Sequence, residues 1–470
     1  MGDGARTMTT GNLIPSLVAP RALTRRDLVP FLAPLLVALL ARGLYVYATI
    51  DFRLRPLQDN AAYLNRGEYL ASHYALMPIL VPGHGSYPDA YWPPGFPVML
   101  AMLIKLHSLA MTLWFGKHFS VLLWSRLGMS VVSVLGLAGL ALLAYRLFGR
   151  RIALIVCWIG ALYLPWIDLG ASVYSESLFV PLVIATCLAM VEYRRVRRRR
   201  WLVAAGLLTG LSAMTHSNGV VLIPIMAVAA WAIGRSKPGG FPLRALGPAV
   251  IVLAAALVIA PWTIRNEIKL HAFVPFGTSL GNTLAGTYNS DSAHASPPGR
   301  WLQPPNRPQY KPIFRRYRIA SSAEDAALRR RAFQYIGDHP LYLATVAFWN
   351  TARLLDLADF HATLRAARAQ YVPGWSVWMQ DVEVWALFVL ASAGAFTRRA
   401  RSAPLWFWAV PILLFVSVVW LGTGGARFRS PVDPFLILLA ACAVNTAGSL
   451  IPARAQRRAV RLGSARARSA

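Results

Sequence analysis

Asp59 lies in a polar segment, residues 51–118, that separates the first long apolar stretch of the chain from the second. A carboxylate held at a membrane surface could take the proton of an attacking hydroxyl or amine, or could hold a cation. Asp is also a preferred N-cap residue, and residues 59–75 have the pattern of an amphipathic helix lying at the interface. The spacing leaves both interpretations open.

Glu176 begins a later apolar stretch, inside the run Ser175-Glu176-Ser177. It could be a second catalytic carboxylate. The helix dipole also favours a carboxylate in the first turn of a helix, which is a sufficient structural reason for Glu176. Asp168 has the same two interpretations with a weaker case for chemistry, and His216 has the position of an ordinary turn histidine.

Arg427 and Arg429 lie in a glycine-rich turn, residues 422–434, between the last two apolar stretches. Guanidinium groups bind phosphate through paired hydrogen bonds, and glycine lets backbone N–H groups approach it. Interfacial arginines also pair with anionic lipid headgroups, so this alternative stays open. Arg265 and Asn266, at the end of another apolar stretch, could bind the same anion.

Aromatic residues gather in the same polar segment as Asp59. Tyr91 and Trp92 begin the run Tyr-Trp-Pro-Pro-Gly-Phe-Pro, and Tyr63 follows Asp59 at the spacing of one helical turn. Such rings could line a groove for a sugar or a prenyl chain, or could form an interfacial aromatic belt. We assign Tyr63, Tyr91 and Trp92 to substrate binding.

The composition is that of a polytopic membrane protein. Of 470 residues, 56% are hydrophobic and 14% are charged, whereas an average soluble domain has about 25% charged residues. Lys and Arg number 48 against 19 acids, and the arginines lie mostly in clusters between apolar stretches. This is the positive-inside pattern, and no nucleic-acid-binding module accompanies it, so we expect no nucleic-acid partner.

We expect an all-α fold of about ten membrane spans, give or take about two, with large outer loops that carry interfacial helices. Arginines before the first span and in the run 194–200 place both termini in the cytoplasm. The first span has no cleavable signal before it and is read as an anchor. The predicted spans are 28–50, 119–146, 152–167, 174–192, 201–215, 218–233, 245–263, 378–396, 403–421 and 432–451.

This topology divides the chain into five parts. They are a cytoplasmic tail (1–27), an N-terminal transmembrane module (28–263) that includes the outer catalytic loop 51–118, an outer loop region with an interfacial helix (264–377), C-terminal transmembrane helices (378–451) and a basic cytoplasmic tail (452–470). Within the outer region, residues 323–337 have a helical pattern.

Three features of the apolar segments need an interpretation. The segment 94–108 is short and ends at Lys105 and His107, so we read it as interfacial or re-entrant. The segment 341–356 is read as lying on the outer surface, because a crossing there would move the later arginine clusters outside. Arg42, inside the first span, is expected to pair within the helix bundle rather than to bind substrate.

Signatures of several enzyme classes are absent. The sequence has no Walker loop, no His-Glu-x-x-His, no Gly-x-Ser-x-Gly and no Cys-x-x-Cys pair. Their absence argues against ATP-driven pumps and against hydrolases of those types, but it leaves a carrier open.

Six motifs in order resemble the GT-C class of integral membrane glycosyltransferases, in the bacterial branch related to protein O-mannosyltransferases and lipid A aminoarabinose transferases. The motifs are Asp59 with a Tyr four residues on, Tyr-Trp-Pro-Pro-Gly-Phe-Pro, Arg-Leu-Phe-Gly-Arg-Arg, Ser-Glu-Ser-Leu-Phe, Pro-Trp-Thr-Ile-Arg-Asn and Arg-Phe-Arg-Ser-Pro-Val-Asp-Pro. The resemblance extends over about residues 28–450.

The resemblance implies a polyprenyl-phosphate-linked sugar donor, inversion at the sugar carbon and transfer on the outer face of a bacterial inner membrane. The acceptor would be a glycolipid, a glycan or a protein. Asp59 matches the family's outer-loop acid, Glu176 its recurrent acid on a later span, and Arg427 and Arg429 the basic turn near the donor phosphate. Many relatives have a second acid where this chain has Asn60, so a divalent cation stays an open possibility.

A transporter or flippase of a lipid-linked saccharide is the alternative. It would bind phosphate with the same arginines but would need functional charges near the bilayer midplane, and often paired repeats. The polar residues here gather at one predicted face and no repeat is evident, which favours the transferase.

Overall fold

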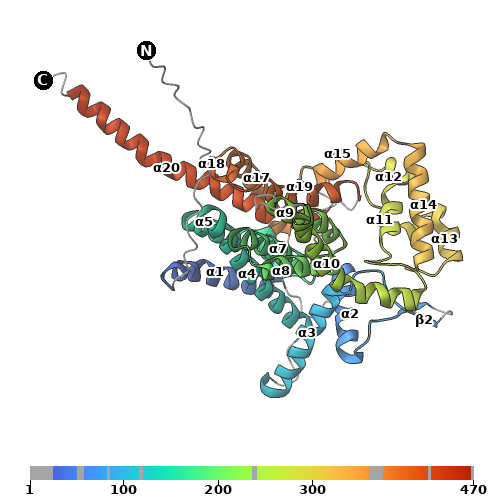
Figure 1. Cartoon of the computed structure of the whole chain (residues 1–470). Coiled ribbons are helices and arrows are strands. Elements are labelled where there is room, and N and C mark those ends of the chain that lie inside the picture. Colours follow the sequence, from blue (N-terminus) through green and yellow to red (C-terminus); the bar gives the residue numbers. More distant parts are fainter. Residues whose placement is uncertain are drawn as a thin grey trace, which may run out of the picture.

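The computed structural model describes residues 25–49, 58–81, 85–115, 120–234, 241–358, 364, 374–421 and 425–466. These parts of the chain are mainly helical, with one short antiparallel hairpin in which Ile79 pairs with Tyr87 (Figure 1). The predicted all-α polytopic fold is therefore confirmed, and the hairpin is a small addition to it.

The elements follow one another in this order. The first half of the chain contains α1 (Arg25–Thr49), α2 (Gln58–His73), β1 (Ile79–Val81), β2 (Gly85–Tyr87), α3 (Gly95–Ala110), η1 (Met111–Phe115), α4 (Val121–Phe148), α5 (Arg150–Leu162), α6 (Leu164–Gly170), α7 (Ser175–Val196), α8 (Arg199–Thr215), η3 (Ser217–Val221) and α9 (Leu222–Gly234). The second half contains α10 (Phe241–Leu270), α11 (Leu280–Thr287), α12 (Ser290–Ala293), η4 (Pro304–Asn306), η5 (Pro308–Tyr310), α13 (Lys311–Arg316), α14 (Ser322–Asp338), α15 (Tyr342–Leu354), α17 (Gly374–Ala395), α18 (Arg398–Arg401), α19 (Leu405–Val419), η6 (Ala426–Arg429) and α20 (Asp433–Arg466).

Long apolar helices form the bundle. Among the described residues, six helices are long and apolar enough to cross a membrane, or seven if the bent pair α5 and α6 counts as one span. The shorter apolar helices α19 and 433–449 lie beside them. The chain is thus an integral membrane protein, and the count of about ten spans stays a prediction.

Small residues let the central helices approach closely. A methyl group on Gly206 of α8 would lie 2.7 Å from the Cβ of Ala254 on α10, and one on Gly210 would lie 2.8 Å from the carbonyl oxygen of Ala255. Glycines four residues apart on one face are a common device for packing transmembrane helices. They fix α8 against α10 and so place the ends of both helices.

Arg42 of α1 is fully buried and pairs within the bundle. Its Nε donates to the Ser133 hydroxyl over 2.9 Å and its Nη1 to the Ala38 carbonyl over 3.1 Å. The guanidinium also lies over the ring of Trp166, 5.9 Å from its centre. These partners match the expected structural role.

Helix α3 extends past the predicted segment 94–108, whose interpretation as interfacial or re-entrant stays a prediction. The helical segment Gly95–Leu113 is continuous and is one of the six that could cross a membrane. The polar residues that marked its predicted end are accommodated by neighbours: Lys105 donates to the Tyr74 hydroxyl over 2.8 Å, and the His107 ring packs against Trp124. The helix therefore continues past them.

The outer region, α11 to α15, forms a group of short helices beyond the end of α10 (Figure 1). The predicted helix 323–337 is confirmed as α14, Ser322–Asp338. Helix α15 has 13 residues and is not among the candidate membrane spans of the described residues. The placement of residues 341–356 on the outer surface stays a prediction.

We predict a pH-dependent stability at Glu324, which lies in the first turn of α14 and is buried. Desolvation by burial, together with the neighbouring Asp325, raises the pKa of Glu324 to about 7, although its carboxylate accepts the Ala320 N–H over 2.5 Å. The folded state therefore holds this proton more tightly than the unfolded chain. The stability that it contributes is complete below the ordinary pKa of 4.5 and declines as the pH rises through about 7.

Glu324→Gln should consequently melt at a higher temperature than wild type at pH 8.5 and at the same temperature at pH 4.5, measured in detergent. Glu68→Gln, at an exposed position of α2, is the matched control. An equal effect of Glu324→Gln at both pH values would contradict the prediction.

Candidate active site

Three segments that are distant in the sequence bring charged side chains together around Arg427. Its Nη2 donates to a carboxylate oxygen of Asp59, and its Nε lies 3.5 Å from Oε1 of Glu176. Asp59 stands in the first turn of α2, Glu176 in the first turn of α7, and Arg427 in the turn η6. The two sequence-predicted carboxylates thus share one guanidinium.

Helix ends explain why carboxylates stand at these places. Both Asp59 and Glu176 lie at helix N-termini, where the partial positive charge of the helix dipole stabilises them. The Glu176 side chain is 2% exposed, whereas that of Asp59 is 36% exposed. Glu176 is therefore a buried partner of Arg427, and Asp59 is the carboxylate of the two that is open to solvent.

Ser175 and His216 surround the buried Glu176. The Ser175 hydroxyl donates to Oε2 of Glu176 over 3.0 Å, and Nε2 of His216 lies 3.8 Å from Oε1. Burial lowers the pKa of His216, even though Glu176 acts in the opposite direction. His216, expected as an ordinary turn residue, is thus a neutral neighbour of the predicted acid.

Aromatic rings form one wall beside this cluster. Tyr63 stacks on Trp92 with ring centres 4.5 Å apart, meets Phe96 edge-on, and donates to the Ser175 hydroxyl over 3.3 Å. Arg66 of α2 lies 4.7 Å from the Trp92 ring. The sequence-predicted Tyr63 and Trp92 are therefore next to each other, with Tyr63 linked to the acid cluster.

Two buried polar atoms at the cluster lack a partner among the described residues. They are Oδ1 of Asn60, which follows Asp59, and the hydroxyl of Tyr174, whose ring lies 4.5 Å from the Arg427 guanidinium. Buried polar groups are normally hydrogen-bonded, so unsatisfied ones need an explanation. Both atoms therefore belong to a polar interior next to Arg427 that the described side chains do not fully satisfy.

A second polar group, centred on Asp89, lies around the loop before α3. Asp89 pairs with Arg66 over 2.6 Å and accepts the Tyr91 N–H over 2.7 Å, and its backbone carbonyl accepts from Arg265 over 2.9 Å. Asn266 accepts a second hydrogen bond from Arg265. Arg265, Asn266 and Tyr91 therefore lie close together. Trp92, whose ring contacts Arg66, follows Tyr91 directly in the chain.

Sequence reasoning missed Arg66 and Asp89. Arg66 lies two turns after Asp59 on the same face of α2, a spacing that could have identified it. Asp89 stands two residues before Tyr91 in the chain, but nothing in its spacing indicates an arginine partner.

Two predicted candidates lie elsewhere. Arg429 is 3% exposed and is bound by Asp433, by Asp356 and by the Leu354 carbonyl. Its donors are therefore used away from Asp59 and Glu176, the two carboxylates that pair with Arg427. Asp168 of α6 accepts from Gln380 over 3.3 Å and is not part of the Glu176 cluster. Both have the surroundings of structural residues.

The described residues contain no group of three His, Cys, Asp or Glu side chains with the geometry of a metal site. The position after Asp59 is Asn60, and Asp59 itself is paired with Arg427. These donors alone do not form a fitting cation site, and we derive no chemical step through a metal.

Comparisons with known proteins identify the fold. Residues 96–264 match the dolichyl-phosphate-mannose-protein mannosyltransferase family. This match covers less than half of the chain; it includes Glu176 and His216 and excludes Asp59 and Arg427. No curated protein sequence matches the chain.

Several solved structures are similar in shape. The oligosaccharyltransferase AglB of Archaeoglobus fulgidus, in complex with an inhibitory peptide and a dolichol-phosphate, has a TM-score of 0.51 at 13% identity, over 93% of this chain and 52% of its own. An oligosaccharyltransferase of Archaeoglobus fulgidus in complex with zinc and sulfate has a TM-score of 0.51 at 14% identity, over 90% of this chain and 49% of its own. ArnT of Cupriavidus metallidurans, bound to undecaprenyl phosphate, has a TM-score of 0.39 at 16% identity, over 91% of this chain and 79% of its own.

These matches confirm the resemblance to GT-C membrane glycosyltransferases that the sequence motifs predicted. At these identities the solved structures show the fold. The chain spans about half the length of the oligosaccharyltransferase that it resembles.

We predict that Arg429 is a structural residue. Arg429→Met leaves Asp356 and Asp433 buried without their cation, so it should destabilise the fold by about 3–5 kcal/mol. Arg398→Met, at an exposed position of α18, is the control and should cost little. The unfolding midpoint in detergent measures both, and a midpoint unchanged by Arg429→Met would contradict this assignment.

Proposed function

We propose that this chain is a membrane glycosyltransferase that moves a sugar from a polyprenyl-phosphate donor to a hydroxyl or amine acceptor. The observation that carries the proposal is the Arg427 guanidinium between Asp59 and Glu176, beside an aromatic wall. The family match over residues 96–264 and the GT-C fold support it. The solved oligosaccharyltransferase of that fold holds a dolichol-phosphate.

Arg427 is the residue that would receive the donor phosphate. Its Nη1 has no partner among the described residues, and its side chain is 28% exposed. A guanidinium can bind a phosphate and stabilise the charge that develops on it as the sugar leaves. Glu176, buried behind it, keeps Arg427 in place.

Donor binding would then activate Asp59. While Arg427 pairs with Asp59, a carboxylate oxygen of Asp59 is occupied by the guanidinium. When the phosphate draws the guanidinium to itself, this oxygen becomes free to accept the proton of the acceptor. Arg427 therefore couples occupation of the donor site to the readiness of the base.

The transfer is a single displacement with inversion. A lone pair of the acceptor oxygen or nitrogen forms the new bond to the anomeric carbon, and the bond from that carbon to the phosphate oxygen breaks. Its electron pair leaves with the prenyl phosphate beside Arg427. The proton of the acceptor passes to Asp59, so that atoms and charges balance.

The remaining predicted residues would hold the substrates. Tyr63 and Trp92 offer ring faces to a sugar, and Tyr91 presents a hydroxyl that accepts from Asn282 over 2.8 Å. Arg265 and Asn266, held near Asp89, would bind the pyranose hydroxyls or a second phosphate oxygen. Arg429 would act through the fold alone.

The proposed site faces the outside of a bacterial inner membrane. The arginine clusters that mark the cytoplasm lie at the opposite ends of α4, α7 and α17 from Asp59 and Glu176. Residues 264–377, which the predicted topology places on the same outer face as the site, would select a glycolipid, glycan or protein acceptor.

Asp59→Asn tests the proposed base. With a panel of polyprenyl-phosphate sugars and membrane acceptors, the turnover of purified Asp59→Asn should fall by about 10²–10⁴-fold, because the amide cannot accept the proton. Donor binding should be retained, since Arg427 stays in place. Glu68→Gln, which removes an acid from an exposed position of the same helix α2, is the matched control and should keep full turnover.

Equal turnover of Asp59→Asn and wild type would remove Asp59 from the mechanism and leave Glu176 as the candidate acid. Donor binding or translocation by wild type without transfer to any acceptor would favour the flippase alternative.

A further inference from the structure

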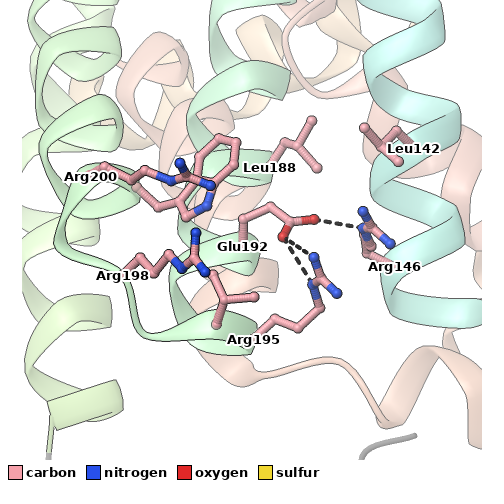
Figure 2. Close-up of a pocket in the computed structure, with 9 residues that line it drawn as sticks. Leu142, Arg146, Leu188, Glu192, Arg195, Arg198 and Arg200 are labelled. Atoms are coloured by element: carbon pink, nitrogen blue, oxygen red, sulfur yellow. Dashed lines mark hydrogen bonds and ion pairs between the residues drawn. The ribbon is translucent and has the colours of Figure 1, made fainter. Parts of the chain in front are cut away.

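A second charged cavity lies at the other end of α7 from Glu176. It has a volume of about 670 Å³ and opens between α4, α7 and the start of α8 (Figure 2). Glu192 stands there in the last turns of α7, which places it about 24 Å from Glu176 along the helix. The cavity is therefore separate from the candidate active site.

The cavity has an excess of positive charge. Glu192 is the one acid among its lining residues, whereas four arginines line it: Arg146, Arg195, Arg198 and Arg200. Glu192 is 4% exposed and forms ion pairs with Arg146 over 2.6 Å and with Arg195 over 2.7 Å. A single carboxylate cannot neutralise both, so the lining carries a net charge of about +3.

Many guanidinium donors in this lining are free. Arg146 uses only its Nε toward Glu192, so its Nη1 and Nη2 have no partner among the described residues. The Arg198 side chain has no ion pair or hydrogen bond in the described parts of the chain, and Arg200 lies over the Trp201 ring at 5.6 Å. An anion in the cavity would therefore meet several unused N–H groups.

The turn between α7 and α8 holds the two outer arginines in place. Arg197 adopts a left-handed backbone conformation with φ of 55°, and its Nη1 donates to the Ile233 carbonyl over 2.6 Å. Figure 2 shows Arg198 and Arg200 on one side of Glu192, and Arg146 and Arg195 on its other side. The four arginines thus line one cavity, with Arg198 and Arg200 at exposed positions on its rim.

Apolar side chains complete the lining. Leu142, Leu188 and Trp201 lie among the arginines. Ligand cavities of small molecules measure roughly 300–1,000 Å³, so this one has room for more than a phosphate ion. Charged donors next to apolar walls suit an amphiphile that carries a phosphate.

We propose that this cavity binds the phosphate headgroup of an anionic membrane lipid at the cytoplasmic face. The net charge of the lining matches a phosphate monoester or diester, and the leucines and Trp201 suit the glycerol and the first part of an acyl chain. The predicted topology places the run 194–200 at the membrane surface, where such lipids are found. The site would anchor the ends of α4, α7 and α8 to that leaflet.

The experiment measures lipid retention by the full chain in detergent, by native mass spectrometry. Phosphatidic acid is the probe, phosphatidylcholine and oleate are the comparators, and glycerol 3-phosphate is the soluble competitor. Wild type should retain phosphatidic acid at least tenfold better than the double variant Arg198→Ala with Arg200→Ala. The control, Arg398→Ala with Arg399→Ala, removes equal charge from exposed positions of α18 and should behave as wild type.

Equal retention by the Arg198/Arg200 variant and wild type would overturn the proposal, as would equal losses in both double variants or equal binding of oleate. Displacement by millimolar glycerol 3-phosphate would overturn the lipid as occupant in favour of a soluble phosphate ester. If the alanine variant fails to fold, Arg198→Lys with Arg200→Lys replaces it, with an expected intermediate loss because lysine lacks the planar fork. The readout is binding, so it does not depend on transfer activity.

Discussion

The candidate site depends on one guanidinium shared by two carboxylates at a membrane boundary. A charge taken out of water is costly unless a partner compensates it, and Glu176 is almost fully buried. Arg427 supplies this compensation and reaches Asp59 with another nitrogen. Glu176 therefore needs Arg427 as its partner. The second contact of Arg427 keeps the exposed carboxylate of Asp59 next to the guanidinium.

The rest of the fold brings the three segments to this point. Helix α7 begins at the site and ends at the basic cavity, so a single rigid helix connects two charged regions near opposite faces of the bundle. Close packing of α8 on α10 through Gly206 and Gly210 sets where His216 lies. Arg429, two residues from Arg427, fixes the η6 turn through Asp356 and Asp433. Arg427 and Arg429 thus lie close in the sequence but bind different carboxylates.

Much of the architecture could be predicted from the sequence, because apolar length and arginine clusters report directly on membrane helices. The carboxylates Asp59 and Glu176 could also be selected, since each stands at a predicted helix start. Their common partner could not be predicted, because contact between residues 59, 176 and 427 depends on how distant helices pack. For the same reason Arg429 and Arg427 look alike in sequence, and only their neighbours separate a buried structural arginine from an accessible one. The full length of helix α3 could not be predicted either, because Lys105 and His107 are accommodated by the side chains of Tyr74 and Trp124 from other segments.

The most direct measurement is a structure of the full chain with a bound polyprenyl phosphate. The proposed function predicts that the phosphate lies within hydrogen-bond distance of the Arg427 guanidinium and that Asp59 no longer pairs with it. A phosphate bound elsewhere, with the pair between Asp59 and Arg427 intact, would contradict the central claim.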